Sequence, residues 1–193
     1  MENNITFTSI IRPVKKSVFD KAAGHISSKN FVDYPWNCSQ SVRGQESYTT
    51  GVLDCTMCGI TDGQDVFMMH ICPTKKENSN FSKIKDFMLN KIDFKNKDLS
   101  AFVIGAKDYP DDKTSYRLFD NFIKFLKSKG VPTTSIRGGD VYEPVDVLYR
   151  SQNDEWLIAS RYLDRFVGKE PPEKVLNHIF PEIKLIEDDI ITD

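Results

Sequence analysis

The sequence predicts an α+β domain in which β-hairpins dominate, and three observations support this fold class. Two pairs of short β-prone runs are each joined by a turn signal, which is typical of a hairpin. Two other segments carry apolar residues at helical spacing. The chain has 193 residues, of which 39% are hydrophobic, and its 13 Phe and 7 Tyr residues can fill the core of one domain.

Most of the expected strands are the arms of two hairpins. The first hairpin turns at Asp62-Gly63, a pair that suits a two-residue type I′ turn. The second turns around residues 151–154. A short apolar run bounded by polar residues is typical of a further, buried strand. The expected strands are Thr56–Ile60, Val66–Cys72, Leu99–Gly105, Thr133–Ile136, Val145–Arg150 and Glu155–Ser160.

Two segments are expected to form helices with one apolar face. Residues 114–129 have the clearest stripe of apolar side chains, and Gly130 with Pro132 is a stop signal. An earlier helix follows a Ser79 or Asn80 cap and carries its stripe from Phe81 to Met88. Weaker helical patterns lie at Lys15–His25 and Pro172–Ile179.

The chain divides into three parts by the clarity of these patterns. Residues 45–160 hold both hairpins and both clear helices, so they form the principal predicted domain. Residues 1–44 are expected to be an N-terminal extension packed on that core. Residues 161–193 are expected to hold a C-terminal helix and an acidic tail. We find no internal repeat and no low-complexity stretch.

Charge and hydropathy exclude several classes of function. The formal net charge is -2, without the dense Lys and Arg that nucleic acids or anionic membranes require. No apolar run reaches the ~18 residues of a membrane helix, and the N-terminus lacks the apolar core of a Sec signal. Four Cys are too few for a disulfide scaffold. We therefore expect folding in a reducing cytoplasm, with the cysteines as thiols.

Cys55 and His70 lie at the two ends of the first predicted hairpin. With a two-residue turn at Asp62-Gly63, they stand directly opposite each other and share a face, with Cβ atoms ~4.5–5.5 Å apart. That approach lets an imidazole serve as the base for a nucleophilic thiol. A one-residue slip would send the side chains to opposite faces. The alternative is a Cys and a His that are simply packed in an apolar hairpin.

A zinc site is a further alternative. The sequence Cys55-Thr-Met-Cys58, followed by His70 and Cys72, contains ligand types that Zn²⁺ prefers. Cys55 and Cys58 are three apart in a predicted strand, however, so their side chains face opposite sides. No second closely spaced pair completes the set, although Cys38 is a distant candidate. We therefore expect neither a metal nor a cofactor.

Three segments share their order and spacing with a known family. They are Thr49-Thr-Gly-Val-Leu-Asp-Cys55 with Phe67-Met-Met-His70-Ile-Cys-Pro73; Val103-Ile-Gly-Ala106; and the helix to Gly130-Val-Pro132 with the strand and Gly138-Gly139-Asp140 after it. In this order they resemble the CheD family of chemoreceptor glutamine deamidases. They also resemble the toxin deamidases of that fold, which include cytotoxic necrotizing factor catalytic domains and the Burkholderia lethal factor. The likeness covers about residues 45–160.

The resemblance implies a CheD-like fold, a mixed or antiparallel β-sandwich with flanking helices. It also implies a protein-glutamine deamidase that converts Gln to Glu and releases ammonia. Cys55 would attack the amide carbon as a thiolate and form a thioester. His70 would be its base, and as an imidazolium it would lower the pKa of the thiol. Thr49, which matches the family's Thr position, would orient His70.

Departures from the family pattern favour a divergent, toxin- or effector-like virulence protein. Leu53-Asp54 stands where the family carries a small Gly/Ser pair, and the two extensions have no counterpart in CheD. The expected partner is a protein substrate in a host cell, with no nucleic acid and no membrane span. Such a protein would be cytoplasmic in the producing cell and secreted by a non-Sec route. The acidic tail at residues 182–193 resembles a type IV secretion signal.

Two functions from other classes remain open. The same pair of side chains serves other cysteine hydrolases, such as a protease, an isopeptidase or a transglutaminase. A non-enzymatic interaction domain, with Cys55 and His70 in structural roles, is the other alternative.

Overall fold

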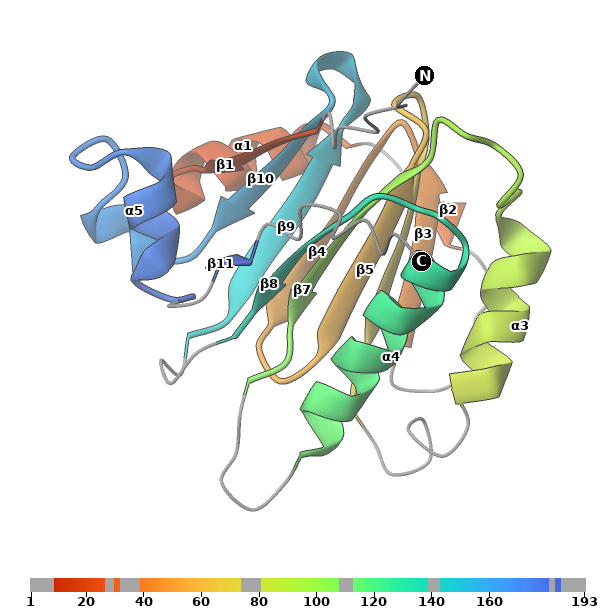
Figure 1. Cartoon of the computed structure of the whole chain (residues 1–193). Helices are drawn as coiled ribbons and strands as arrows, with labels where there is room; N and C mark the ends of the chain where they lie inside the picture. Colours follow the sequence, from red (N-terminus) through yellow and green to blue (C-terminus); the bar gives the residue numbers. More distant parts are fainter. Residues whose placement is uncertain are drawn as a thin grey trace, which may run out of the picture.

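The computed structural model describes residues 9–26, 30–31, 39–73, 81–107, 113–138, 143–180 and 183–184. In these ranges the chain forms two β-sheets with helices on their outer faces, which confirms the α+β class (Figure 1). The smaller sheet has the order β1 (Ile10–Pro13), β10 (Glu155–Ala159), β9 (Val145–Arg150) and β4 (Glu46–Val52). The larger sheet has the order β11 (Ile183–Lys184), β8 (Thr133–Arg137), β7 (Ser100–Gly105), β5 (Thr56–Thr61), β6 (Val66–Ile71), β3 (Ser39–Gly44) and β2 (Asn30–Phe31).

Most neighbouring strands are antiparallel, but each sheet also holds a parallel pair. In the small sheet β1 runs parallel to β10, and in the large sheet β7 runs parallel to β8. Parallel neighbours need a long crossover, and helix α4 (Thr114–Ser128) provides it between β7 and β8. Both sheets are therefore mixed, as expected.

The inner faces of the two sheets enclose an apolar core. Trp156 of β10 is completely buried there, with Phe102 of β7 and Tyr149 of β9 beside it at ring-centroid distances of 5.2 and 4.7 Å. Gly59 of β5 lies under the indole, and a Cβ at this glycine would overlap the Trp156 ring. The missing side chain of Gly59, in the middle of a fully buried strand, thus leaves the space that the largest side chain of the opposite sheet fills.

Helices cover the outer faces of both sheets. Helix α3 (Phe81–Lys91) and helix α4 pack on the large sheet, and the two lie on the same side of it in Figure 1. Helix α1 (Lys16–His25) packs on the small sheet through Phe19, which is buried against Leu148 and Leu157. The apolar stripe expected on α4 is confirmed as its buried face, which consists of Leu118, Phe119, Phe122, Phe125 and Leu126.

The two hairpins differ in how well the sequence predicted them. The second is confirmed, since β9 and β10 are antiparallel neighbours joined by residues 151–154. In the first, however, Thr61 pairs with Val66, so the turn has four residues and not two. The Asp62 carboxylate explains the longer turn, because it accepts hydrogen bonds from the N–H groups of Gln64 (3.0 Å) and Asp65 (2.9 Å).

The longer turn changes the partner of His70. His70 lies opposite Met57, so the prediction that Cys55 directly faces it is wrong. Cys55 lies one residue before the Thr56–Ile71 pair and Cys72 one residue after it. Because the register moves by an even number of residues, each side chain keeps the face that was expected for it.

The first 44 residues contribute strands to both sheets. β1 pairs with β10 along its whole length, and β3 pairs with β6 from Ser39 to Gly44. The chain then passes at Gln45 from the large sheet into β4 of the small sheet. A last helix, α5 (Pro172–Asn177), follows the second hairpin and packs near β1.

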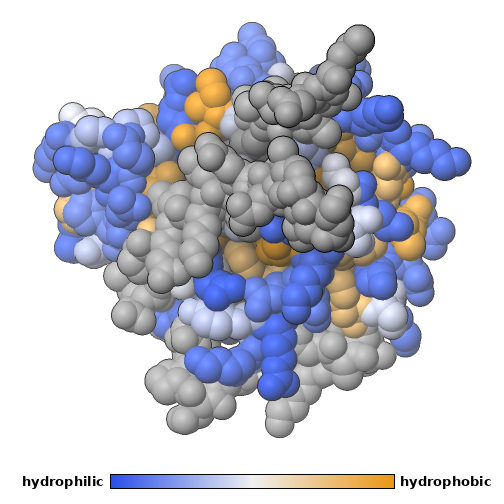
Figure 2. Space-filling view, in the orientation of Figure 1, coloured by the Kyte–Doolittle hydropathy of each residue, from blue (hydrophilic) through white to orange (hydrophobic). Residues whose placement is uncertain are grey.

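The face of the molecule drawn in Figure 2 is mainly hydrophilic where the structure describes it. Figure 2 shows polar side chains over much of one face, with separate smaller apolar areas. The large apolar side chains that protrude into solvent include Ile10, Val18 and Leu89, which lie on three different elements. No described helix is both long enough and apolar enough to cross a bilayer.

The packing of Gly59 against Trp156 can be tested by adding one methyl group. We expect Gly59→Ala to lower the free energy of unfolding by about 1–3 kcal/mol, because the buried indole must move away from the new Cβ. Urea denaturation followed by tryptophan fluorescence measures the change. Gly24→Ala in α1 is the matched control, since a Cβ there meets nothing within 4 Å; we expect its stability to stay within about 1 kcal/mol of the wild type. Equal stability of the two variants would contradict this packing.

Candidate functional site

Cys55 lies where the chain crosses from the small sheet to the large one. Residues 53–55 connect the end of β4 to the start of β5. The segment after β7 holds this crossing in place: the N–H of Lys107 donates to the carbonyl of Leu53 (3.2 Å), and the N–H of Ala106 donates to the carbonyl of Cys55 (3.1 Å). The main chain around the thiol is therefore fixed by backbone hydrogen bonds.

Helix α4 secures the remaining carbonyl of the crossing. The hydroxyl of Ser115, in the first turn of the helix, donates to the carbonyl of Asp54. All three carbonyl groups of residues 53–55 thus accept hydrogen bonds from residues that are distant in the sequence. The crossing depends on the large sheet and its covering helix for its shape.

Gly105 permits this close contact. Its φ of 126° lies in the region that glycine adopts with little strain, and a Cβ at this position would overlap the Cys55 carbonyl oxygen. Its own carbonyl accepts a 2.6 Å hydrogen bond from the N–H of Gly138, which follows β8. Both glycines belong to the segments that resemble the CheD family, and the structure brings Gly105 against the predicted nucleophile.

Cys72 lies directly beside the predicted nucleophile. The two sulfur atoms, Cys55 Sγ and Cys72 Sγ, are 3.3 Å apart, and the Asp54 Oδ1 atom is 3.7 Å from Cys55 Sγ. Cys55 is 9% exposed, whereas Cys72 is partly exposed. The sequence suggested Cys72 only as a ligand in the zinc alternative and did not predict its contact with Cys55.

This environment raises the pKa of the Cys55 thiol above its ordinary value. The hydrogen bond with Cys72 is the largest cause, followed by burial and by the negative charge that Cys72 and Asp54 can carry nearby. The shift is opposite to the lowering expected from an imidazolium partner. Burial and these neighbours therefore favour the protonated thiol over the thiolate at Cys55.

Thr49 and His70 are in contact, as the family resemblance led us to expect. The Thr49 Oγ1 atom of β4 is 2.7 Å from the His70 Nδ1 atom of β6, so this hydrogen bond joins the two sheets. Thr49 is buried and His70 is partly exposed. A hydrogen bond at one ring nitrogen orients an imidazole and directs its Nε2 atom to the opposite side.

His70 and Cys55 lie on the same side of the β5–β6 pair. Successive side chains of a strand alternate, so His70 and Cys72 point to one side of β6. The contact between Cys72 and Cys55 places the predicted nucleophile on that side as well. Cys55 and His70 are therefore diagonal neighbours across the pair, a relation that typically separates residues by ~7–8 Å and lets long or aromatic side chains interact.

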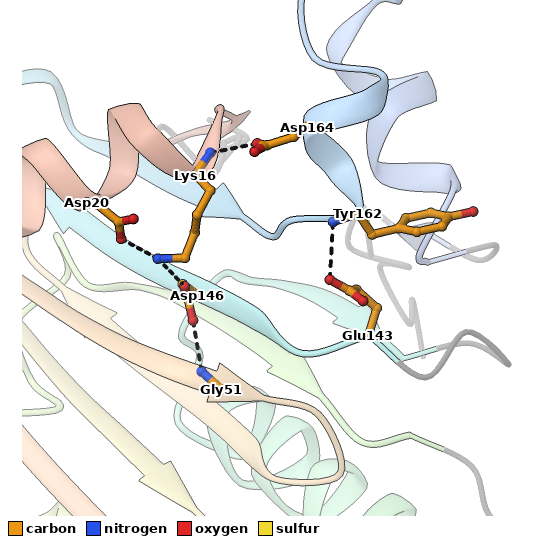
Figure 3. Close-up of polar contacts among 7 residues, drawn as sticks. All are labelled: Lys16, Asp20, Gly51, Glu143, Asp146, Tyr162 and Asp164. Carbon is orange, nitrogen blue, oxygen red and sulfur yellow. Dashed lines mark hydrogen bonds and ion pairs between the residues drawn. The ribbon is translucent and has the colours of Figure 1, made fainter.

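A bulge in β4 separates Thr49 from the crossing, and an acidic residue stabilises it. The register with β9 shifts between Thr49 and Val52, where Gly51 has a φ of 73°. The N–H of Gly51 donates to Asp146 Oδ1 of β9 (2.9 Å), and Lys16 Nζ of α1 lies 3.1 Å from Asp146 Oδ2 (Figure 3). The sequence carries a signal for this role, since Asp146 interrupts an apolar run of a buried strand.

Of the two remaining cysteines, one lies away from the Cys55–Cys72 contact and the other lies outside the described residues. Cys58 is fully buried on the helix-covered face of the large sheet. Cys38 lies outside the ranges that the structure describes. Within those ranges, no group of three or more His, Cys, Asp or Glu side chains is arranged to hold a metal ion.

The sequence was compared with protein-family models and with curated proteins. No family model matches it. No curated protein is significantly similar to it.

Removal of the Cys72 sulfur tests the cause of the raised Cys55 pKa. In Cys72→Ala we expect the pKa of Cys55 to fall, so that the thiolate fraction of Cys55 at neutral pH rises by about tenfold for each unit of the fall. Alkylation of Cys55 by iodoacetamide then becomes faster, by a smaller factor, because a less basic thiolate is a weaker nucleophile. The pH dependence of the rate, followed by peptide mass spectrometry, measures the change, with buried Cys58 as the unreactive internal control. An unchanged pH profile for Cys55 would show that Cys72 does not control its ionisation.

Proposed function

We propose that this protein is a protein-glutamine deamidase of CheD-like fold, a hydrolase with Cys55 as its nucleophile. The observation that supports this most is the Thr49–His70 hydrogen bond of 2.7 Å between the two sheets. It joins the two residues that the resemblance assigns to the base and its orienting partner, on the side of β6 that Cys72 shares with Cys55.

The reaction proceeds through a thioester. Cys55 Sγ attacks the side-chain amide carbon of a substrate glutamine, and His70 takes up the thiol proton and delivers it to the departing nitrogen, which leaves as ammonia. Water, activated by His70, then hydrolyses the thioester to a glutamate and restores the thiol. Because the pKa of Cys55 is raised, the proton leaves as the thiol attacks, and no thiolate accumulates beforehand.

The crossing at residues 53–55 offers hydrogen-bond donors for the oxyanion that forms when Cys55 attacks the amide carbon. The carbonyl and N–H groups of a trans peptide point in opposite directions. Since the carbonyls of Leu53 and Asp54 point to Lys107 and Ser115, the N–H groups of Asp54 and Cys55 point away from those partners. We assign these two N–H groups to the oxyanion hole, where one donor typically contributes about 10²–10³ in rate.

The recessed thiol favours a side-chain amide as the substrate group. Cys55 is 9% exposed, so a slender glutamine side chain reaches its sulfur more readily than a segment of main chain does. The near-neutral charge of the chain also fits a protein partner better than a polyanion. We place the substrate in a host cell, as the resemblance to deamidase toxins implies, with secretion as an effector by a non-Sec route.

The proposal is tested by a search for converted glutamines. The full chain is incubated with a host-cell protein extract, and tryptic peptides are examined for the mass gain of an amide-to-carboxylate conversion. We expect Cys55→Ala to abolish the conversion and His70→Ala to slow it by about 10²-fold or more, because the base is lost. Cys58→Ala, which removes a thiol on the other face, is the control that keeps its activity.

The same incubation separates deamidation from the alternative activities. A primary amine added to the extract would be attached to the target by a transglutaminase, and a protease or isopeptidase would produce shorter fragments. Converted glutamines that persist in Cys55→Ala would disprove the role of this residue. If no product of any kind depends on Cys55, a non-enzymatic interaction domain becomes the better interpretation.

The role of Thr49 has its own test. Thr49→Val keeps the shape of the side chain but removes the hydroxyl that contacts His70 Nδ1. We expect kcat to fall by about tenfold or more with little change in KM, because the ring of the base is no longer held. Thr49→Ser, which restores a hydroxyl, should recover most of the rate. Full activity in Thr49→Val would show that the hydrogen bond has only a structural role.

A further inference from the structure

We propose that Cys55 and Cys72 form a reversible disulfide through reaction with small-molecule disulfides of the glutathione type, with Cys72 as the residue that is modified first. Formation of this disulfide does not depend on the proposed function. Only its consequence for activity rests on that function.

The two sulfurs are already in contact. Cys55 Sγ and Cys72 Sγ are 3.3 Å apart, and their residues flank the Thr56–Ile71 pair at the end of the β5–β6 ladder. A disulfide requires an S–S distance of about 2.0 Å and a Cβ–Cβ distance of about 3.5–4.5 Å. The 3.3 Å separation of the sulfurs must therefore close by about 1.3 Å, a movement that we assign to the side-chain torsion angles of the two residues.

The fold holds one partner and leaves the other accessible. Hydrogen bonds from Ala106, Lys107 and Ser115 fix the segment that carries Cys55. Cys72 follows the last residue of β6 and is partly exposed, so a small disulfide in solution can approach it. Cys55, at 9% exposure, is better shielded from such a reagent.

The raised pKa of Cys55 agrees with this assignment. The hydrogen bond with Cys72 and the negative charge that Cys72 can carry raise the pKa of Cys55. When one of two neighbouring thiols ionises, the other is held protonated. Because Cys72 is also the more exposed of the two, we assign to its sulfur the attack on a dissolved disulfide.

Two thiol–disulfide exchange steps complete the reaction. In the first, the Cys72 thiolate attacks one sulfur of glutathione disulfide; a Cys72–glutathione mixed disulfide forms, and one glutathione leaves and takes up a proton. In the second, the Cys55 thiol loses its proton, and its sulfur attacks Cys72 Sγ and releases the second glutathione. The two protein thiols are oxidised to one disulfide, and glutathione disulfide is reduced to two glutathione thiols.

The disulfide would protect the proposed nucleophile from other reagents and would make it inactive. A Cys55 sulfur bonded to Cys72 has no thiol with which to attack an amide carbon. A protein in this state is inactive where disulfides persist, such as outside the cell, and is activated where reduced glutathione is abundant. The pair therefore adds a redox control to the proposed deamidase.

The experiment titrates the reduced full chain with glutathione disulfide and maps its cysteines. After the reaction is stopped with acid, peptide mass spectrometry reports thiols, glutathione adducts and cross-links. In the wild type we expect a Cys55–Cys72 cross-link that dithiothreitol reverses. In Cys55→Ser we expect a persistent glutathione adduct on Cys72. In Cys72→Ser we expect Cys55 to be modified at least about tenfold more slowly than Cys72 is in the wild type.

Cys38→Ser is the matched control, and we expect it to form the same cross-link as the wild type. A stable Cys72 adduct without a cross-link in the wild type would overturn the inference, as would a cross-link that requires Cys38. Preferential attack on Cys55 would overturn the assigned order. Circular dichroism of each variant establishes that it is folded before the titration.

Deamidase activity is measured on the same samples so that the two proposals can fail separately. Loss of activity on cross-linking and its return with dithiothreitol would support both. A cross-link in a protein without Cys55-dependent activity would disprove only the proposed function. Activity without any cross-link would disprove only the redox pair.

Discussion

The close approach of the Gly105 main chain to the Cys55 carbonyl is the constraint on which the candidate site depends. A side chain at Gly105 would overlap that carbonyl, and the neighbouring N–H of Ala106 donates to the same oxygen. The crossing between the sheets is consequently pressed against the end of β7, and helix α4 secures its other side through Ser115. The site is thus formed by backbone contacts between distant segments, which fix the main chain that carries the thiol.

The same crossing explains why the residues of the site come from both sheets. β4 belongs to the small sheet and carries Thr49, whereas β6 belongs to the large sheet and carries His70. The bulge at Gly51, held by Asp146, bends β4 between Thr49 and the crossing. Packing of Trp156 against Gly59 keeps the two sheets at a constant separation deeper in the core. The hydrogen bond across the sheets is therefore supported by the core as well as by the local strand geometry.

Electrostatics distinguishes this site from a preformed thiolate–imidazolium pair. Cys72 and Asp54 surround the Cys55 sulfur with groups that bear negative charge when ionised, and burial adds to their effect. A thiol held in this way is protected against indiscriminate alkylation and oxidation, because the thiolate is the reactive form. The proposed activity then relies on His70 at the moment of attack, and the proposed disulfide begins at Cys72.

Periodicity and composition alone determined the α+β class, the apolar face of α4 and the hairpin of β9 and β10, because these features depend on residues close together in the sequence. Register in the first hairpin also pointed to Cys55 and His70 and to the shared face of their side chains, whereas Thr49 was assigned through the family resemblance. The structure decided the rest. Locally, the hydrogen bonds of the Asp62 carboxylate favoured a four-residue turn over the two-residue turn that Asp62-Gly63 also suits, and this set Cys72 against Cys55. Tertiary structure shaped β4 through its pairing with β9 and fixed the crossing at residues 53–55 through contacts with residues 105–107 and 115. These last contacts join residues that are distant in the sequence, which no local pattern encodes.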